Sequence, residues 1–136
     1  MKERTFVLLK PDAVRRKLIG RIIQRFEDKG FEIVEMKMIT LSKEMAEEFY
    51  KMHKGKDFYE RLIEFMTSGR VVAMIIEGEN AISVVRKMIG KTNPAEAEPG
   101  TIRGDFALST PDNLIHASDS KENAEREIKL FFGKLE

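Results

Sequence analysis

The six consecutive apolar residues from Val71 to Ile76 constrain the fold more than any other stretch of this 136-residue sequence. An apolar run of four to eight residues, bounded by turn-forming residues, is typical of a strand buried on both faces. Such a strand must lie inside a sheet, and helices must pack against that sheet to bury it. The run is too short to cross a bilayer, which takes about 20 apolar residues.

Apolar residues elsewhere alternate between the spacing of strands and the spacing of helices. We predict further strands over residues 5–9, 31–39 and 114–116. Helices are predicted over residues 18–26, 45–50, 58–66, 81–89 and 124–131. The predicted N-caps are Ser42 and Ser120, and the predicted helix ends are Gly30 and Gly90. With no linker and no repeat, we predict a single α+β domain over residues 1–136, a small sheet with helices packed on it.

Composition excludes several classes of protein. The 24 basic and 23 acidic residues leave a net charge of +1, so we predict no membrane partner and no specific nucleic acid partner. The absence of cysteine excludes disulfides, cysteine zinc sites and thiol catalysis. The start, Met1 to Thr5, lacks the apolar stretch of a signal peptide, so we expect a cytoplasmic protein.

The segment 91–112 shows little periodicity and holds three of the four prolines. Loops longer than about 12–15 residues are uncommon unless they are functional or disordered. We interpret this segment as a functional loop. Gly90-Lys91-Thr92 at its start is not a P-loop, because the position that should hold the first glycine is Val85 and the motif follows a helix.

His116, near the end of the chain, has three interpretations from the residues alone: a core histidine, a metal ligand or a nucleophile. A metal site would usually need more histidines or clustered carboxylates, and the only other histidine is His53, on a predicted helix. A hydrolase triad of Ser118, His116 and Asp119 lacks the surrounding nucleophile-elbow pattern. The core interpretation therefore competes mainly with the nucleophile.

Three cationic residues favour the nucleophile if they share a pocket with His116. Lys10 follows a predicted strand, Arg86 lies on a predicted helix and Arg103 lies in the long loop. Each alone is most simply a solvated surface charge. Together they would suit phosphate, because arginine binds it through two hydrogen bonds and lysine acts as a point charge. A neutral imidazole beside bound phosphate can act as a phosphoryl acceptor.

Four stretches of the sequence carry a resemblance to a known family. They are Lys10–Val14, Thr92–Ala95, Pro99–Phe106 and Asn113–Asp119, and the similarity runs in register from Lys2 to about Phe132. Together they closely resemble nucleoside diphosphate kinase. The resemblance implies a ferredoxin-like βαββαβ sandwich with a four-stranded antiparallel sheet and surrounding helices. It also implies a ping-pong exchange of the γ-phosphate between nucleoside triphosphates, such as ATP and GTP, and diphosphates.

The resemblance assigns roles to single residues. His116 would carry the phosphoryl group on its pros nitrogen. Mg²⁺ would be held mainly by the nucleotide phosphates, with no direct protein ligand. The phosphates would be bound by Lys10, Arg86, Thr92 and Arg103, and the sugar by Asn113 and Lys10. The base would stack on Phe58, with Leu62 nearby. The histidine would be framed by Tyr50, Ser118 and Glu127. His53 is interpreted as a supporting or surface residue.

Two departures from the family pattern stand near the histidine. Ala117 replaces a more common glycine, and Pro111-Asp112 replaces a common Gly-Arg pair. We expect broad base acceptance, because every base has a π-face that can stack on Phe58. The alternative hypothesis is a non-catalytic nucleotide- or nucleic-acid-binding module on the same frame.

A homo-oligomer is also expected, a hexamer rather than a tetramer. The resemblance implies such assemblies. In addition, the apolar residues around Phe31, Phe49 and Ile22 are expected to exceed what one small domain can hide.

Overall fold

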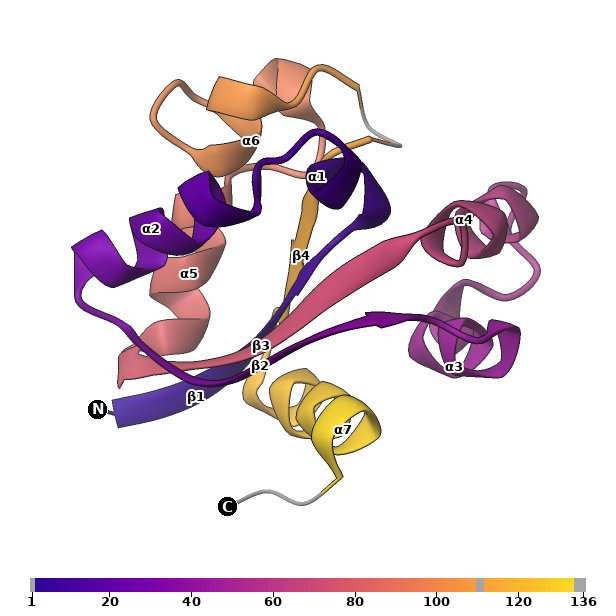
Figure 1. Ribbon diagram of the computed structural model, residues 1–136, viewed down its shortest axis with the longest axis horizontal. Coiled ribbons are helices and arrows are strands. Elements are labelled where there is room, and N and C mark those ends of the chain that lie inside the picture. Colours follow the sequence, from indigo (N-terminus) through magenta and orange to yellow (C-terminus); the bar gives the residue numbers. More distant parts are fainter. Residues whose placement is uncertain (1, 110–111, 134–136) are drawn as a thin grey trace.

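A computed structural model describes residues 2–109 and 112–133 of the chain (Figure 1). Its centre is a four-stranded sheet in the order β2-β3-β1-β4, and every neighbouring pair is antiparallel. The strands are β1 (Lys2–Leu9), β2 (Glu32–Thr40), β3 (Arg70–Glu79) and β4 (Ile115–Ala117). The apolar run 71–76 lies in β3, inside the sheet, as predicted. The ferredoxin-like α+β fold is confirmed.

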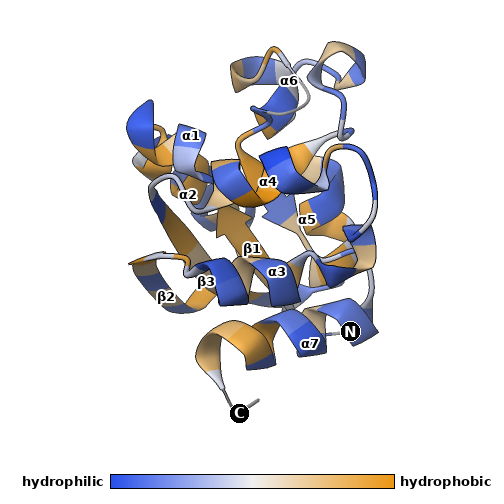
Figure 2. Cartoon of the chain, turned by 90° about the vertical axis from the view of Figure 1, so that its right-hand side faces the viewer, coloured by the Kyte–Doolittle hydropathy of each residue, from blue (hydrophilic) through white to orange (hydrophobic). Residues whose placement is uncertain are grey.

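Helices cover both faces of the sheet (Figure 1). One face packs against α1 (Pro11–Arg15), α2 (Ile19–Lys29), α5 (Ala81–Ile89) and α6 (Ile102–Phe106). The other face packs against α3 (Lys43–Phe49), α4 (Tyr59–Met66) and α7 (Lys121–Phe132). Each helix shows hydrophobic residues among hydrophilic ones in Figure 2, which is the amphipathic pattern of a helix lying on a core.

The predicted helix boundaries follow from local chemistry. The Ser42 hydroxyl accepts a hydrogen bond from the Met45 backbone N–H at 3.1 Å, and that of Ser120 accepts from Asn123 at the same distance. Gly30 ends α2 with φ of 108°, a left-handed conformation that glycine adopts without strain. These caps were all predicted.

The segment 91–112 is more ordered than its lack of periodicity indicated. It contains the 3₁₀ turn η2 (Pro94–Glu96) and α6, whose N-cap Thr101 accepts a hydrogen bond from the Gly104 N–H at 3.0 Å. A second 3₁₀ turn, η1 (Lys51–His53), follows α3. Pro111, the first residue of the Pro111-Asp112 pair that departs from the family pattern, lies outside the described residues.

The apolar side chains around Phe31, Phe49 and Ile22 were expected to remain exposed on the subunit, but they are buried. These side chains are 8%, 1% and 0% exposed because they pack into the two cores on either side of the sheet. That expectation was wrong as an argument for an oligomer. The large apolar side chains that are exposed among the described residues are Met36, Met38, Met52, Phe58 and Leu108.

Within residues 2–109 and 112–133, the structure contains no helix that is both long and apolar enough to cross a membrane.

Candidate active site

The pairing of the first and last strands brings the two ends of the chain together. In the antiparallel register of β1 and β4, Leu8 lies opposite His116. Lys10 follows the end of β1, and its backbone N–H donates to the Leu114 carbonyl at 2.8 Å. Lys10, Asn113 and His116 therefore lie at one end of the central strands, although Lys10 is more than a hundred residues from the other two in sequence.

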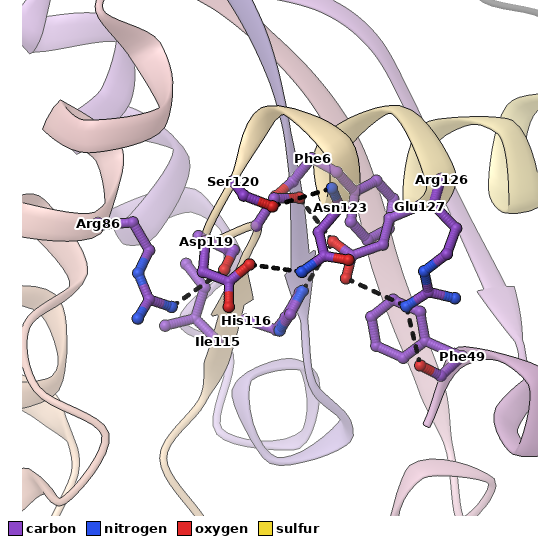
Figure 3. A network of polar contacts seen from close by, with 12 residues as sticks. Phe6, Phe49, Arg86, Ile115, His116, Asp119, Ser120, Asn123, Arg126 and Glu127 are labelled. Atoms are coloured by element: carbon purple, nitrogen blue, oxygen red, sulfur yellow. Dashed lines mark hydrogen bonds and ion pairs between the residues drawn. The ribbon is translucent and has the colours of Figure 1, made fainter. Parts of the chain in front are cut away.

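His116 is held by a buried carboxylate from α7 (Figure 3). Its Nε2 lies 2.9 Å from Oε1 of Glu127, which is 4% exposed. The Ser118 hydroxyl donates to the same oxygen at 2.6 Å. An ionised carboxylate accepts a hydrogen from Nε2, and that tautomer leaves the Nδ1 lone pair free. Because Ser118 is bonded to Glu127 and Asp119 to Asn123, the hydrolase triad is not formed.

Aromatic rings pack beside the histidine. The Phe49 ring lies edge-on to the imidazole, with centroids 5.0 Å apart, and the Tyr50 ring packs on Phe49 at 4.7 Å. Burial, together with the charge of Glu127, raises the pKa of the Tyr50 phenol well above its usual value. Its hydroxyl is buried without a hydrogen-bond partner among the described residues. Tyr50 is therefore a neutral group on one side of the histidine.

The two predicted phosphate-binding arginines are fixed by backbone carbonyls. The guanidinium of Arg103, which is 4% exposed, donates to Gly90 at 3.0 Å, to Ile115 at 2.5 Å and to Asn113 at 3.4 Å. Arg86 donates to the Ala117 carbonyl at 3.2 Å (Figure 3). Burial and the neighbouring Arg86 lower the pKa of Arg103 to about 10, so it remains a cation at neutral pH. Both cations lie against β4 and the residues leading into it.

Lys10, Asn113 and Thr92 form a continuous polar chain. The Lys10 ammonium donates to the Asn113 side-chain oxygen at 2.7 Å, and the Asn113 amide donates to the Thr92 carbonyl at 3.0 Å. Burial and the charge of Arg103 lower the pKa of Lys10 to about 8, while Asp12 and Asp112 act in the opposite direction. The predicted phosphate- and sugar-binding residues are thus brought together.

Phe58 and Leu62 lie farther out, at the start of α4. Phe58 is the N-cap of that helix and is 44% exposed, whereas Leu62 packs against the core below α4. The His53 ring lies 5.3 Å from the Phe58 ring and 6.2 Å from that of Tyr50, which places it between the two. A series of neighbouring rings therefore runs from His116 to Phe58, with His53 as one of its members.

The site is rich in cations and poor in clustered metal ligands. Among the described residues, no group of three or more His, Cys, Asp or Glu could hold a metal ion. A hollow of about 520 Å³ is bordered by Arg86, Lys87, Gly90, Lys91, Thr92, Glu98 and Thr101. It shares two residues with the predicted phosphate-binding set, but its lining does not include His116.

Sequence reasoning missed three charged residues next to the site. Asp12 accepts a hydrogen bond from the Leu114 N–H at 3.2 Å. Arg126 donates to the Phe49 carbonyl at 3.4 Å and lies 3.7 Å from the second oxygen of Glu127. The Lys56 ammonium lies 5.8 Å from the centre of the Phe58 ring. Asp12 lies within the stretch Lys10–Val14 that carries the family resemblance, and Arg126 and Lys56 each stand within two residues of a predicted site residue, but nothing in the sequence gives any of the three a role.

An imidazole with one nitrogen held by a carboxylate, on a strand whose backbone carbonyls hold two arginines, is suited to covalent transfer of an anionic group, which is the chemistry of a phosphotransferase. The sequence model of the family "Nucleoside diphosphate kinase" matches residues 3–136. The chain therefore belongs to the nucleoside diphosphate kinase family, and it is an enzyme of that kind.

Individual relatives are similar in sequence, and two of them in structure, over nearly the whole chain. The nucleoside diphosphate kinase of Methanocaldococcus jannaschii is 83% identical over 132 residues, which is 97% of this chain and 94% of that protein. A solved structure from Encephalitozoon cuniculi is 49% identical, with a TM-score of 0.95 over 97% of this chain and 90% of that one. A halophilic relative from Halobacterium salinarum, solved with CDP, is 46% identical, with a TM-score of 0.95 over 98% of this chain and 90% of that one.

Proposed function

We propose that this kinase transfers the γ-phosphate of a nucleoside triphosphate to a nucleoside diphosphate through a phosphohistidine at His116. The observation that carries the proposal is the 2.9 Å contact between Nε2 of His116 and Glu127, which leaves Nδ1 as the nucleophile. Lys10, Arg86, Thr92 and Arg103 bind the phosphates, and Asn113 with Lys10 binds the sugar. Tyr50 and Ser118 frame the imidazole and its carboxylate.

The exchange needs no net proton transfer. The Nδ1 lone pair attacks the γ-phosphorus, the bond from phosphorus to the β-phosphate oxygen breaks, and the diphosphate leaves with that electron pair. The phosphorylated ring is a cation that keeps its hydrogen on Nε2, and the Glu127 carboxylate stabilises it. A second diphosphate then attacks phosphorus with a terminal oxygen, and the electron pair of the breaking phosphorus–nitrogen bond returns to Nδ1.

Mg²⁺ enters as part of the nucleotide substrate. The described residues near His116 offer cationic side chains rather than clustered carboxylates, so phosphate oxygens and water are the ligands that fit the ion. When bound, the ion neutralises charge on the phosphates during transfer. The chain's own contribution is to fix the phosphates with lysine and arginine.

Broad base acceptance follows from the position of Phe58. An exposed ring can stack on purines and pyrimidines alike, so we expect rates among the four bases, ribo and deoxy, to differ by about tenfold or less. The halophilic relative solved with CDP binds a pyrimidine nucleotide, which supports this expectation. We also propose a cytoplasmic location, where these nucleotides are used.

The phosphoenzyme provides the decisive test. The protein is incubated with γ-labelled ATP and Mg²⁺, and we expect a phosphoprotein that is labile in acid and stable in base. GDP added afterwards should remove the label as GTP. An acid-stable label would point to a hydroxyl such as that of Ser118, and the absence of label would contradict the proposal.

The matched variant is His116→Ala. It should fold and bind nucleotide, yet lose exchange activity by about 10⁴-fold or more, as expected for removal of a nucleophile. Full activity would contradict the covalent route. Failure to fold would instead favour a core role for His116.

We further propose that the enzyme is a homo-oligomer, a hexamer rather than a tetramer. The support from the structure is at edge strand β2, where Met36 and Met38 are 52% and 44% exposed beside an unpaired strand edge. A second copy of the chain would cover both. Light scattering at micromolar concentration should give six subunit masses, and Met38→Lys should lower that mass. The control is Met52→Lys, away from β2, and a monomeric wild type would contradict the proposal.

A further inference from the structure

Leu114 has an unusual backbone conformation between two parts of the site. Its φ is 75°, a left-handed value that large side chains rarely adopt, and its side chain is fully buried. The Ile115 N–H donates to the Asn113 carbonyl at 2.9 Å, which closes a three-residue turn around Leu114. Turns of this positive-φ kind are rare and strained, and they persist only where surrounding contacts hold them.

The residues that follow β1 supply two of the contacts that hold this turn. The Lys10 N–H donates to the Leu114 carbonyl at 2.8 Å, and the Leu114 N–H donates to Oδ2 of Asp12 at 3.2 Å. Arg103 binds the carbonyls on either side of Leu114, those of Asn113 and Ile115. Asp12 is the only side chain among the described residues that accepts from the Leu114 N–H.

The turn sets the geometry of the reaction. On its near side, Asn113 receives the Lys10 ammonium at 2.7 Å. On its far side, the chain enters β4, and His116 follows two residues after Leu114. A relaxed Leu114 would rotate the peptide planes on both sides, and a shift of about 1 Å near reacting groups can cost about 10²-fold in rate.

The charge of Asp12 has a second effect, on Lys10. The charged groups that act on the Lys10 ammonium are Arg103 on α6, which disfavours its cation, and Asp12 and Asp112, which favour it. Lys10 in turn opposes the upward shift that burial imposes on the pKa of Asp12. Oδ1 of Asp12 is buried and has no hydrogen-bond partner among the described residues. The carboxylate therefore acts on the turn through its hydrogen bond from the Leu114 N–H, and on Lys10 through its charge.

We propose that Asp12 is a positioning residue for phosphoryl transfer: its hydrogen bond fixes the strained turn at Leu114, which joins Asn113 to the strand of His116. The proposal rests on the function proposed above for Lys10 and His116. The hydrogen bond of Asp12 and its charge are separable because asparagine retains an oxygen that can accept from the Leu114 N–H but lacks the charge.

The first test compares Asp12→Asn with Asp12→Ala in single-turnover phosphorylation and in kcat/KM from pH 6 to 10. The wild type should lose activity as pH rises through about 8, where Lys10 loses its proton. In both variants, activity should fall at a pH that is lower by about one unit or more, because the negative charge that favours the Lys10 cation has been removed. At pH 6.5, Asp12→Asn should stay within about threefold of wild type, whereas Asp12→Ala should be about 10–100-fold slower, the range known for residues that orient metal ligands.

Asp112→Asn is the matched control. It removes the other carboxylate that acts on Lys10, but Asp112 makes no contact with the Leu114 N–H among the described residues. It should therefore move the alkaline limb of the profile without slowing phosphorylation at pH 6.5. Equal rates for Asp12→Ala and wild type at pH 6.5 would overturn the role in the turn.

A second measurement needs no catalysis. NMR titration of the Lys10 side chain in wild type and Asp12→Asn should show deprotonation at lower pH in the variant. An unchanged titration would overturn the electrostatic role even if the phosphohistidine forms. If the wild type forms no phosphohistidine but the titration shifts, the proposed reaction fails and the role of Asp12 toward Lys10 stands. If Asp12→Ala does not fold, Asp12→Glu tests the turn instead, because its longer side chain displaces the accepting oxygen. The Leu114 amide should then lose protection from hydrogen exchange. Unchanged protection at Leu114 would overturn the role of Asp12 in the turn.

Discussion

The two ends of the site differ in how tightly they are held. At the His116 end, Arg103 and Glu127 are almost fully buried and hydrogen-bonded to several groups each. At the Phe58 end, the ring is 44% exposed at the start of α4, and the described residues that lie next to it as a ring or a cation are His53 and Lys56. In the function proposed above, the buried end would meet the phosphates and the sugar, and the exposed end would meet the base. Rigidity would then be concentrated where geometry controls the rate.

The largest effect should come from loosening the rigid end at Glu127. Glu127→Gln should slow phosphorylation by about 10–100-fold, because the ring loses its orienting carboxylate, while nucleotide affinity changes little. Single-turnover phosphorylation and nucleotide binding at neutral pH test both effects.

Glu125→Gln is the control for that experiment, because Glu125 is an exposed residue on the same helix. It should leave the phosphorylation rate unchanged. A Glu127→Gln enzyme that phosphorylates at the wild-type rate would show that the carboxylate has no orienting role.

A smaller effect is expected at the Phe58 end of the site. Phe58→Ala should raise the KM for nucleotides by about tenfold, since stacking of a base on an aromatic side chain contributes about 1–3 kcal/mol and this ring is partly exposed. The phosphorylation rate at saturation should stay near that of wild type. Steady-state kinetics with four triphosphates measure both, and Met52→Ala on η1 is the control. A variant that lost turnover but not affinity would show that the two ends are not separable.

A further effect should appear in the stability of the free protein. The pKa of Lys10 is lowered to about 8 in the folded state from 10.5, so between these values the unfolded chain binds more protons. Folding free energy should therefore become more favourable as pH rises from about 8 to 10, relative to Lys10→Met. Activity should fall over the same range. Urea unfolding of both proteins at several pH values measures the difference, and parallel profiles would contradict it.

Much of the fold could be predicted because its signals are local. The apolar run in β3, the serine caps at Ser42 and Ser120 and the stop at Gly30 each depend on residues close in sequence. The helix α6 was missed because its five residues are too few to show a period. The apolar side chains expected on the surface are buried because helices cover both faces of the sheet, and a sequence does not reveal which faces are covered.

The residues of the site also divide into those that local motifs identify and those that only the folded chain identifies. Residues within recognisable motifs, such as Lys10, Asn113 and His116, could be named in advance, and the structure brings them together. Their roles remain predictions until the phosphoenzyme is measured. Asp12 and Arg126 could not be assigned, because their importance depends on a hydrogen bond to Leu114 and a contact with Glu127 that exist only in the folded chain.

The pairing of β1 with β4 has a consequence for how activity arises during synthesis. Lys10 leaves the ribosome with the first strand, but its partner Asn113 lies 103 residues later, and Glu127 follows later still. Closing so long a loop is entropically costly and is compensated only when β4 docks on β1. No nascent chain that lacks β4 and α7 can hold His116 against Glu127. If His116 is the nucleophile, as proposed, enzymatic activity reports that β4 and α7 have docked on the first strand.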